Sequence, residues 1–244
     1  MSIRSITLTT IVMTASWAAA IAAAQAPAAD KQARIEALKQ SVAANQAALK
    51  QYTWVETTVV SMKGEVKKQE QMQCSYGADG KVQKTPMPGA QPQQTSQAKG
   101  GGGRRGGRMK EKIVENKVEE LKDYMEKVAA LVKEYVPPDP QRIQAAQAAG
   151  NVDVQPAAQG PAQLTLKNYY KPQDALSIGF DTAAKKLRTY NVNSYVENPK
   201  DDVVTLAVTF GSLDDGTSYP QLVVLDVKNK QIQVKVTNSG YQKK

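Results

Sequence analysis

The chain has 244 residues, no histidine, a single cysteine and a formal net charge of +9. The lack of histidine excludes Cys-His and Ser-His hydrolases and zinc sites that need imidazole, and one cysteine excludes an internal disulfide and a thiolate metal site. The positive charge indicates a protein that is attracted to anionic partners such as lipid headgroups or polyanionic glycans.

The first residues have the layout of a secretory signal peptide. Arg4 precedes a mostly apolar run over residues 6–21, and Ala22 and Ala24 provide the small residues of a cleavage site. We therefore expect residues 1–24 to be removed and the mature protein to be exported to the periplasm, with secretion to the medium as an alternative. Threonine and serine dilute the apolar run, which argues against an uncleaved anchor helix. Because an exported protein seldom meets nucleic acid, no nucleic-acid partner is expected.

The start of the mature chain predicts a helix followed by a β-hairpin. Asp30 is a suitable helix N-cap, and the helix is expected to run to about Lys50. Its apolar positions are Ile35, Leu38, Val42 and Leu49. β-Branched and aromatic residues then dominate residues 52–60, and turn signals at 63–64 and 78–80 predict a hairpin of two strands followed by a short third strand.

Residues 86–108 form an insertion rich in Pro, Gln, Gly and Arg. They contain almost no large apolar side chain, so burial cannot offset the entropy cost of ordering, and the insertion is predicted to be flexible. Arg104, Arg105 and Arg108 lie among glycines, which raises the alternative of an RNA-binding segment. The cluster is short, however, and has no aromatic residue to stack on bases. We therefore expect a tether whose arginines contact an anionic membrane surface.

A long amphipathic helix is predicted over residues 110–135. Its apolar positions recur at alternating spacings of four and three residues and are Val114, Val118, Leu121, Met125, Val128, Val132 and Tyr135. The sequence VPP at residues 136–138 ends this helix. A second, short helix is predicted over residues 139–149, with its first residue as N-cap and Gly150 as terminator, and residues 151–161 are predicted to form a loop.

The remainder of the chain predicts an antiparallel β-meander. The predicted strands cover residues 163–170, 175–180, 186–196, 203–210, 221–227 and 231–237. Turn residues separate them, and the alternation is clearest where Ile232, Val234 and Val236 share one face. A sheet of about eight or nine strands curls, and the helices need an apolar surface to cover. The predicted fold class is therefore α+β: residues 25–244 form one domain, a curved antiparallel sheet (an unclosed half-barrel) whose concave face the helices cover.

Asn45, Leu49, Tyr52 and Trp54 lead from the first predicted helix into long strands joined by a GADGK turn at residues 77–81, and a helical segment and a closing meander follow. This order of elements resembles the periplasmic lipoprotein-carrier (LolA-like) superfamily, in particular its exported bacterial branch. The resemblance implies a half-barrel plugged by helices, with a hydrophobic cavity that binds acyl chains or lipoproteins. The chain departs from that pattern in its insertion and its long helix, and no arginine matches the one that ties the lid to the barrel in the carriers.

The expected function is non-enzymatic binding of a hydrophobic ligand, a lipid or an acylated peptide or lipoprotein, in a cavity between sheet and helices. The residues predicted to line this cavity or its lid are Tyr52, Trp54, Leu121, Met125, Val128, Leu131 and Val132. For each of them the alternative is a place in a dry core. The alternative function is an envelope interaction protein, because the spacing in the 110–135 helix is that of a coiled-coil seam that binds a protein partner. A monomer whose helix packs on its own sheet is favoured over a dimer.

No enzyme, cofactor or metal site is expected. Cys74 lies in a strand-like context with no histidine to activate it, so a buried thiol is expected rather than a nucleophile. The acidic pairs at 201–202 and 214–215 lie beside Pro or Gly between strands, where Asp favours turn geometry. Neither pair has the ligand spacing of a calcium-binding loop.

Overall fold

The computed structural model describes residues 44–87, 107–155, 162–181, 184 and 186–244, with only the backbone described for residues 107–117. The predicted signal peptide, Arg104, Arg105 and the side chain of Arg108 lie outside the described residues, as does most of the predicted insertion. Of the predicted first helix, only its end is described, and residues 44–49 are helical as expected.

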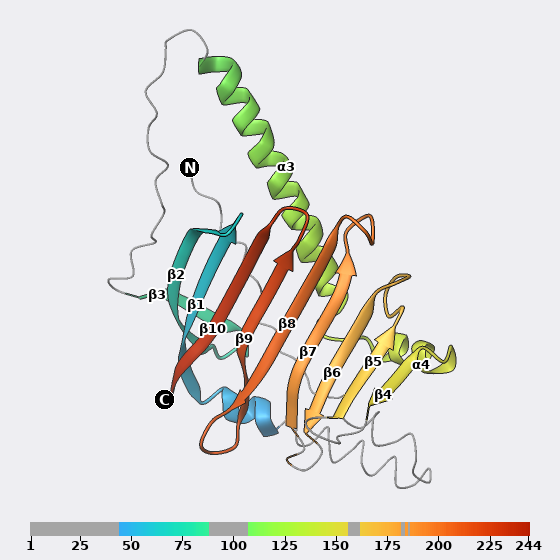
Figure 1. The fold of residues 1–244 in the computed structure, drawn as a ribbon. Coiled ribbons are helices and arrows are strands. Elements are labelled where there is room, and N and C mark those ends of the chain that lie inside the picture. Colours follow the sequence, from blue (N-terminus) through green and yellow to red (C-terminus); the bar gives the residue numbers. More distant parts are fainter. Residues whose placement is uncertain (1–43, 88–106, 156–161, 182–183, 185) are drawn as a thin grey trace.

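All strands in the described residues belong to one antiparallel sheet (Figure 1). They are β1 (Tyr52–Met62), β2 (Glu65–Tyr76), β3 (Val82–Pro86), β4 (Val152–Gln155), β5 (Ala162–Lys167), β6 (Ala175–Asp181), β7 (Lys186–Tyr195), β8 (Val203–Ser212), β9 (Ser218–Val227) and β10 (Ile232–Lys243). Their order across the sheet is β3-β2-β1-β10-β9-β8-β7-β6-β5-β4. Within the described residues the outer strands β3 and β4 do not pair with each other, so the sheet is an unclosed half-barrel, as predicted.

The pairing of β1 with β10 joins the hairpin of β1 and β2 to the C-terminal meander. β10 is the last strand of the C-terminal meander, and β1 adds the N-terminal hairpin to it, with Val60 opposite Val234. A register shift in this ladder coincides with Gly240, whose φ of 61° is accessible to a residue without a side chain. This bulge lets β10 continue to Lys243, whereas the predicted strand ended at residue 237.

β4 lies in a segment that the sequence predicted to be a loop, and that prediction was wrong. Its four residues pair with β5, with Val152 opposite Leu166 and the carbonyl of Asn151 accepting from the N–H of Lys167 at 2.8 Å. The segment has the polar, Pro- and Gly-flanked composition of a loop. Only the neighbouring strand β5, which supplies the hydrogen-bond partners, makes it a strand.

One face of the sheet, called the inner face below, carries the buried core. In β10, Ile232, Val234 and Val236 are buried whereas Gln233 and Lys235 are exposed, as the alternation predicted. The apolar core is the cluster of buried side chains that β5 to β10 contribute on this face, including Leu166, Ile178, Leu206 and Leu225, together with Met125, Val128, Leu131, Tyr135, Ile143 and Ala146 from the helical segment.

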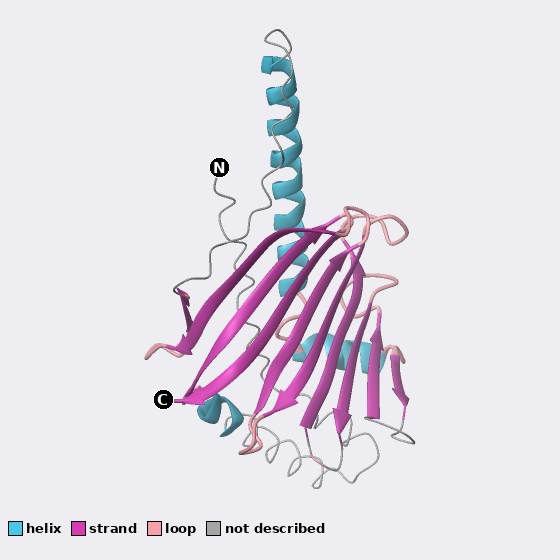
Figure 2. Ribbon diagram, turned by 60° about the vertical axis from the view of Figure 1, so that its left-hand side comes forward, coloured by secondary structure: helices cyan, strands magenta, loops and turns pink. Residues whose placement is uncertain are grey.

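Two helices, α3 (Gly107–Lys133) and α4 (Pro140–Ala148), lie on the same side of the sheet (Figure 1). α4 has the predicted ends: the Asp139 carboxylate caps it by accepting from the N–H of Gln141 at 2.8 Å, and Gly150 has a φ of 70°. α3 begins at Gly107, so the last residues of the predicted insertion are helical. Figure 2 shows that the first half of α3 extends beyond the ends of the strands.

Candidate functional site

The C-terminal half of α3 is packed on the apolar core. Of the residues predicted for a lid, Met125, Val128 and Leu131 are buried in this core, and Leu121 and Val132 are partly buried against it. Val128 has no exposed surface, so no water-sized space adjoins its side chain. Val118, further toward the start of the same apolar stripe, is 51% exposed. The structure therefore brings these five predicted residues together between α3 and the sheet and leaves Val118 exposed.

Loops at the ends of the strands also contact the C-terminal half of α3. The Tyr124 hydroxyl lies 3.5 Å from Asp202, and the Lys127 ammonium donates to Glu197 at 2.7 Å. The ammonium of Lys230 lies 5.0 Å from the centre of the Tyr124 ring. Burial, together with the charge of Asp202, raises the pKa of Tyr124 to about 12, so this phenol remains a donor.

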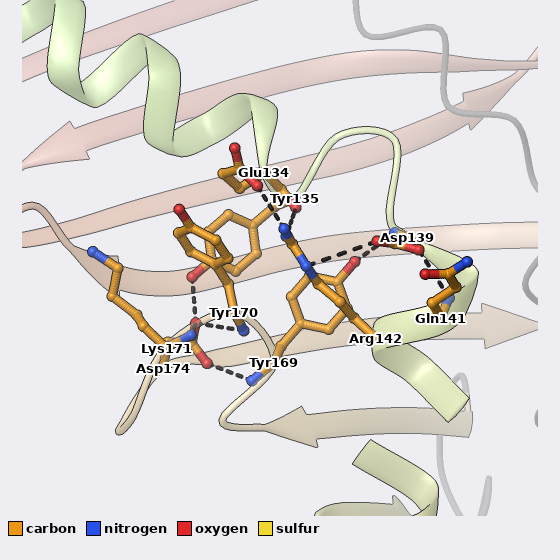
Figure 3. A network of polar contacts seen from close by, with 9 residues as sticks. All are labelled: Glu134, Tyr135, Asp139, Gln141, Arg142, Tyr169, Tyr170, Lys171 and Asp174. Carbon is orange, nitrogen blue, oxygen red and sulfur yellow. Dashed lines mark hydrogen bonds and ion pairs between the residues drawn. The ribbon is translucent and has the colours of Figure 1, made fainter. Parts of the chain in front are cut away.

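A buried carboxylate holds the end of α3 (Figure 3). Asp174 is 2% exposed and accepts hydrogen bonds from the N–H groups of Tyr169 at 2.6 Å, Tyr170 at 3.0 Å and Lys171 at 2.8 Å. The hydroxyl of Tyr135 donates to the same carboxylate. Burial and this hydrogen bond raise the pKa of Tyr135, so the phenol stays protonated.

Strand β7 supplies two further partners for Tyr135. Its hydroxyl oxygen lies 2.7 Å from Ser194 Oγ, and its backbone carbonyl accepts from the Tyr190 hydroxyl. Burial raises the pKa of Tyr190, which also stays protonated. We call Tyr135, Asp174, Ser194 and Tyr190 the anchor cluster. It ties the end of α3 to β7 and to the β5–β6 loop through buried groups.

Arg142 of α4 contacts residues next to the anchor cluster. Its guanidinium donates to the carbonyl of Glu134 at 2.9 Å and to the Glu134 carboxylate at 2.7 Å, and it lies 4.5 Å from the centre of the Tyr170 ring. The Lys171 ammonium donates to the carbonyl of Tyr195 at 2.7 Å. Both cations are engaged by groups of the chain itself, so the arrangement holds α3 in place rather than offering a free cation to a ligand.

Sequence reasoning missed this anchor. Tyr135 is the last residue of the predicted apolar stripe, and Asp174 is one of the turn residues between the strands predicted at 163–170 and 175–180. The two residues are 39 positions apart, and no local pattern pairs them. The only signal was an acidic residue at the start of a strand, which turn geometry explains equally well.

The other two predicted site residues, Tyr52 and Trp54, do not belong to the apolar core. They lie in an aromatic cluster formed by Tyr52, Trp54, Tyr76, Tyr219 and Tyr241. Trp54 is 3% exposed, stacks on Tyr241 with ring centres 5.6 Å apart and donates its indole N–H to Asn238 at 3.2 Å. The Tyr52 hydroxyl donates to Asp215 at 2.6 Å. The predicted site is thus divided between two regions of the molecule.

An ion pair and the single cysteine lie beside the aromatic cluster. The Lys84 ammonium is 2.5 Å from the carboxylate of Glu56, which is 7% exposed. Cys74 has no exposed surface, and the predicted burial of its thiol is confirmed. Burial, reinforced by the charge of Glu56, raises the pKa of the thiol to about 11. The thiolate is therefore scarce at neutral pH.

The two acidic pairs take part in loop contacts. Asp202 accepts from the side chain of Asn229 as well as meeting Tyr124, and Asp215 accepts from the N–H of Thr217 at 3.0 Å, a turn contact of the predicted kind. Over the part of the chain that the structure describes, no three His, Cys, Asp or Glu side chains gather as metal ligands. Among the described helices, none combines the length and apolar character needed to cross a bilayer.

Comparisons with protein-family models, curated proteins and solved structures return no match for this chain. The likeness to the LolA-like superfamily thus rests on the order of elements along the sequence and stays a prediction. The features that bear on function are the apolar contact of α3 with the sheet, the anchor cluster and the region around Trp54.

Proposed function

We propose that the protein is a non-enzymatic, exported binding protein of the LolA-like type that holds a hydrophobic ligand between α3 and the concave face of the sheet. The ligand is a lipid or an acylated peptide or lipoprotein. The observation that carries this proposal is the way α3 is attached: polar contacts hold its C-terminal end, while its contact with the sheet is apolar. A helix attached in this way leaves the sheet without breaking its anchor.

The apolar contact is one that an acyl chain can replace. Met125, Val128 and Leu131 give up no hydrogen bond when they leave the sheet, because none of them carries a polar side-chain group other than a thioether. An acyl chain covers the same sheet surface and gains about 25 cal/mol for each Å² of apolar area removed from water. Replacing the helix by a ligand on the sheet therefore exposes little additional apolar area of the sheet to water.

The anchor cluster and the loop contacts differ in strength, which gives α3 a fixed end and a releasable part. Breaking the buried bonds of Asp174 leaves unsatisfied groups that cost about 1–3 kcal/mol each. The Lys127–Glu197 pair is exposed on both sides, and such pairs contribute about 0–1 kcal/mol. Opening therefore releases the turns around Met125 and Val128 first and keeps the C-terminal end of α3 in place.

The burial of Val128 means that α3 is closed on the sheet in this structure. A permanently filled core is the competing explanation. The two differ in whether α3 yields to a ligand, which direct binding measurements can detect.

The proposal is tested on protein purified from a periplasmic fraction. Solvent extraction followed by mass spectrometry is expected to find an acyl lipid in near-stoichiometric amount, and protein stripped of lipid is expected to take up a fluorescent fatty acid. Val128→Ala weakens the apolar contact and should accelerate uptake, whereas Val118→Ala, the same change at an exposed position of α3, should not. No bound lipid together with no uptake would contradict the proposal.

A second candidate function rests on the first half of α3. This half extends beyond the strands, and Val118, a member of its apolar stripe, is 51% exposed (Figure 2). We infer that this surface docks on a protein partner, with a second copy of the chain as the simplest one. Light scattering should then show concentration-dependent association that Val118→Ser removes. A strict monomer over a wide concentration range rules out the dimer.

A further inference from the structure

The ion pair Glu56–Lys84 lies on the same face of the sheet as the apolar core. Val60 is directly opposite Val234, a core residue, and along the same ladder Glu56 is opposite Asn238. Because side chains on a strand alternate between faces, Glu56 shares the inner face with Val60. Lys84 shares it too, since the registers place Trp54 opposite Cys74 and Cys74 opposite Lys84.

The pair spans three strands at one side of the half-barrel. Glu56 is on β1 and Lys84 on the edge strand β3, so the lysine side chain crosses β2 to place its ammonium 2.5 Å from the carboxylate. The Glu56 side chain is 9% exposed and the Lys84 side chain 18%. The Lys84 side chain is therefore the more accessible of the two, and it lies on the edge strand of the sheet.

A buried ion pair needs a reason other than stability. Removing two charges from water costs several kcal/mol each, and apolar residues of the same volume are often at least as stabilising. On the same face of β1, Thr58 separates Glu56 from Val60 and Met62, which are apolar and pack against the core. Strand β2 adds a second ion pair to this face, Lys68–Glu70, opposite Val60 and Thr58. A polar part of the face that borders the apolar core fits a place where the charged group of a ligand is received while its chain lies on the core.

We propose that Lys84 binds the anionic head, a carboxylate or phosphate, of an acyl ligand whose chain lies along the inner face toward the apolar core. This inference rests on the proposed function. An ammonium has three donors, one of which meets Glu56, so it has donors left for a second anion. Glu56 holds the ammonium in place when the site is empty.

The inner face leads from this head site past Thr58 to the apolar side chains of β1 and β10. Val60 lies four residues from Glu56 along β1, about 13 Å at roughly 3.3 Å per residue, which is within the length of a common fatty acyl chain. Val60 and Met62 of β1 lie on this path, and Val234 and Ile232 of β10 follow at the border of the region under α3. Head and chain thus meet different surfaces of one face.

The test compares a fluorescent fatty acid, parinaric acid, with its uncharged methyl ester at pH 7. Wild-type protein should bind the acid about tenfold or more tightly than the ester, the range of a hydrogen bond to a charged group. Lys84→Met should abolish this preference while ester binding is retained. Glu56→Gln, which removes the competing anion, should increase it. Lys235→Met makes the same change as Lys84→Met on the opposite face and should leave both affinities unchanged.

Opposite signs for the two variants distinguish a head site from a merely structural pair, which both variants would weaken alike. Glu56→Gln leaves no buried carboxylate unpaired, so this variant tests the inference even if Lys84→Met does not fold. If Glu56→Gln leaves the preference for the acid unchanged or lowers it, the inference is overturned. Equal binding of acid and ester by the wild type overturns the head site but leaves the proposed function intact. Binding of neither overturns the proposed function.

Competition identifies the chemistry of the head. Dodecanoate and dodecyl phosphate should both displace parinaric acid more effectively than dodecanol, and the stronger competitor is assigned as the closer mimic of the natural head. Inorganic phosphate and acetate, which lack the chain, should not compete. If dodecanol competes as well as the two anions, or if the chainless anions compete, the head site of an acyl ligand is overturned.

Discussion

The inner face of the sheet consists of two regions that are held together in different ways. Under α3 and α4 the contacts are apolar, whereas around β1 to β3 the same face carries the Trp54–Asn238 hydrogen bond and the Glu56–Lys84 ion pair. Apolar contact is non-directional, so a ligand can replace the helix. Hydrogen bonds and ion pairs need particular partners in particular geometry. The first region therefore suits an exchangeable lid, and the second suits a fixed site that recognises a headgroup.

The same contrast is repeated along α3. The anchor cluster binds its C-terminal end, apolar packing and exposed loop contacts hold the turns just before that end, and Val118, further toward the start, is 51% exposed. A gradient from directional to non-directional contacts along one helix is what a hinged cover requires.

The largest effect on stability is expected from Asp174→Ala, which removes the acceptor from three backbone N–H groups and from Tyr135. Unsatisfied buried donors should lower the free energy of unfolding by about 3–5 kcal/mol, measured by urea denaturation. Asp201→Ala is the matched control, because this carboxylate accepts from Asn198 in an exposed turn and its loss should cost about 0.5 kcal/mol or less. Equal losses would mean that the anchor cluster does not hold α3.

Val128→Ala should have the next largest effect, since it removes two buried methyl groups from the apolar contact. The expected loss in the free energy of unfolding is about 2 kcal/mol, and Val118→Ala on the same helix should cost less than about 0.5 kcal/mol.

Trp54 is the sole tryptophan of a chain without residues 1–24, because the other is Trp17. Its fluorescence and circular dichroism should report the same midpoint, and separate transitions would show that the two regions unfold independently.

Trp54→Phe should cost about 1–2 kcal/mol, because it leaves the buried side-chain oxygen of Asn238 without its donor. Tyr76→Phe keeps an aromatic ring beside Trp54 and removes only a hydroxyl, so a loss below about 0.5 kcal/mol is expected. Both are measured by denaturant unfolding followed by circular dichroism. Similar losses for the two variants would place the stability of this region in ring packing rather than in the hydrogen bond.

The smallest effect at neutral pH is expected from the ionisation of Cys74. Burial raises the pKa of its thiol from 9.0 in the unfolded chain to about 11. The protonated thiol therefore contributes fully to the free energy of unfolding below pH 9, and this contribution is lost as the pH rises through about 11. Lys84 opposes this rise and Glu56 adds to it. At pH 8 a thiol reagent should label the folded protein about a hundredfold more slowly than the unfolded chain. Equal labelling rates would contradict the burial of this thiol.

Local patterns predicted most of the secondary structure because alternation, helical spacing and turn residues act over a few positions. The hairpin after residue 52, the helix α3 and the caps of α4 all appear where these patterns indicated. The edge strand β4 did not follow from its own residues, since it is too short and polar to carry a signal and depends on β5 for its hydrogen bonds. The position of Tyr52 and Trp54 in the strand was predicted, but their separation from the lid residues was not.

The sequence by itself determined the strands other than β4, the helices α3 and α4, and which side chains of one strand share a face, because these depend on periods of about two and 3.6 residues. Only the tertiary structure decided that β1 pairs with β10, that Tyr135 meets Asp174 and that Lys84 reaches Glu56 across β2. Strand neighbours and buried polar partners are chosen by long-range packing, which no local period encodes. The division of one face into an apolar and a polar region is therefore a property of the folded sheet.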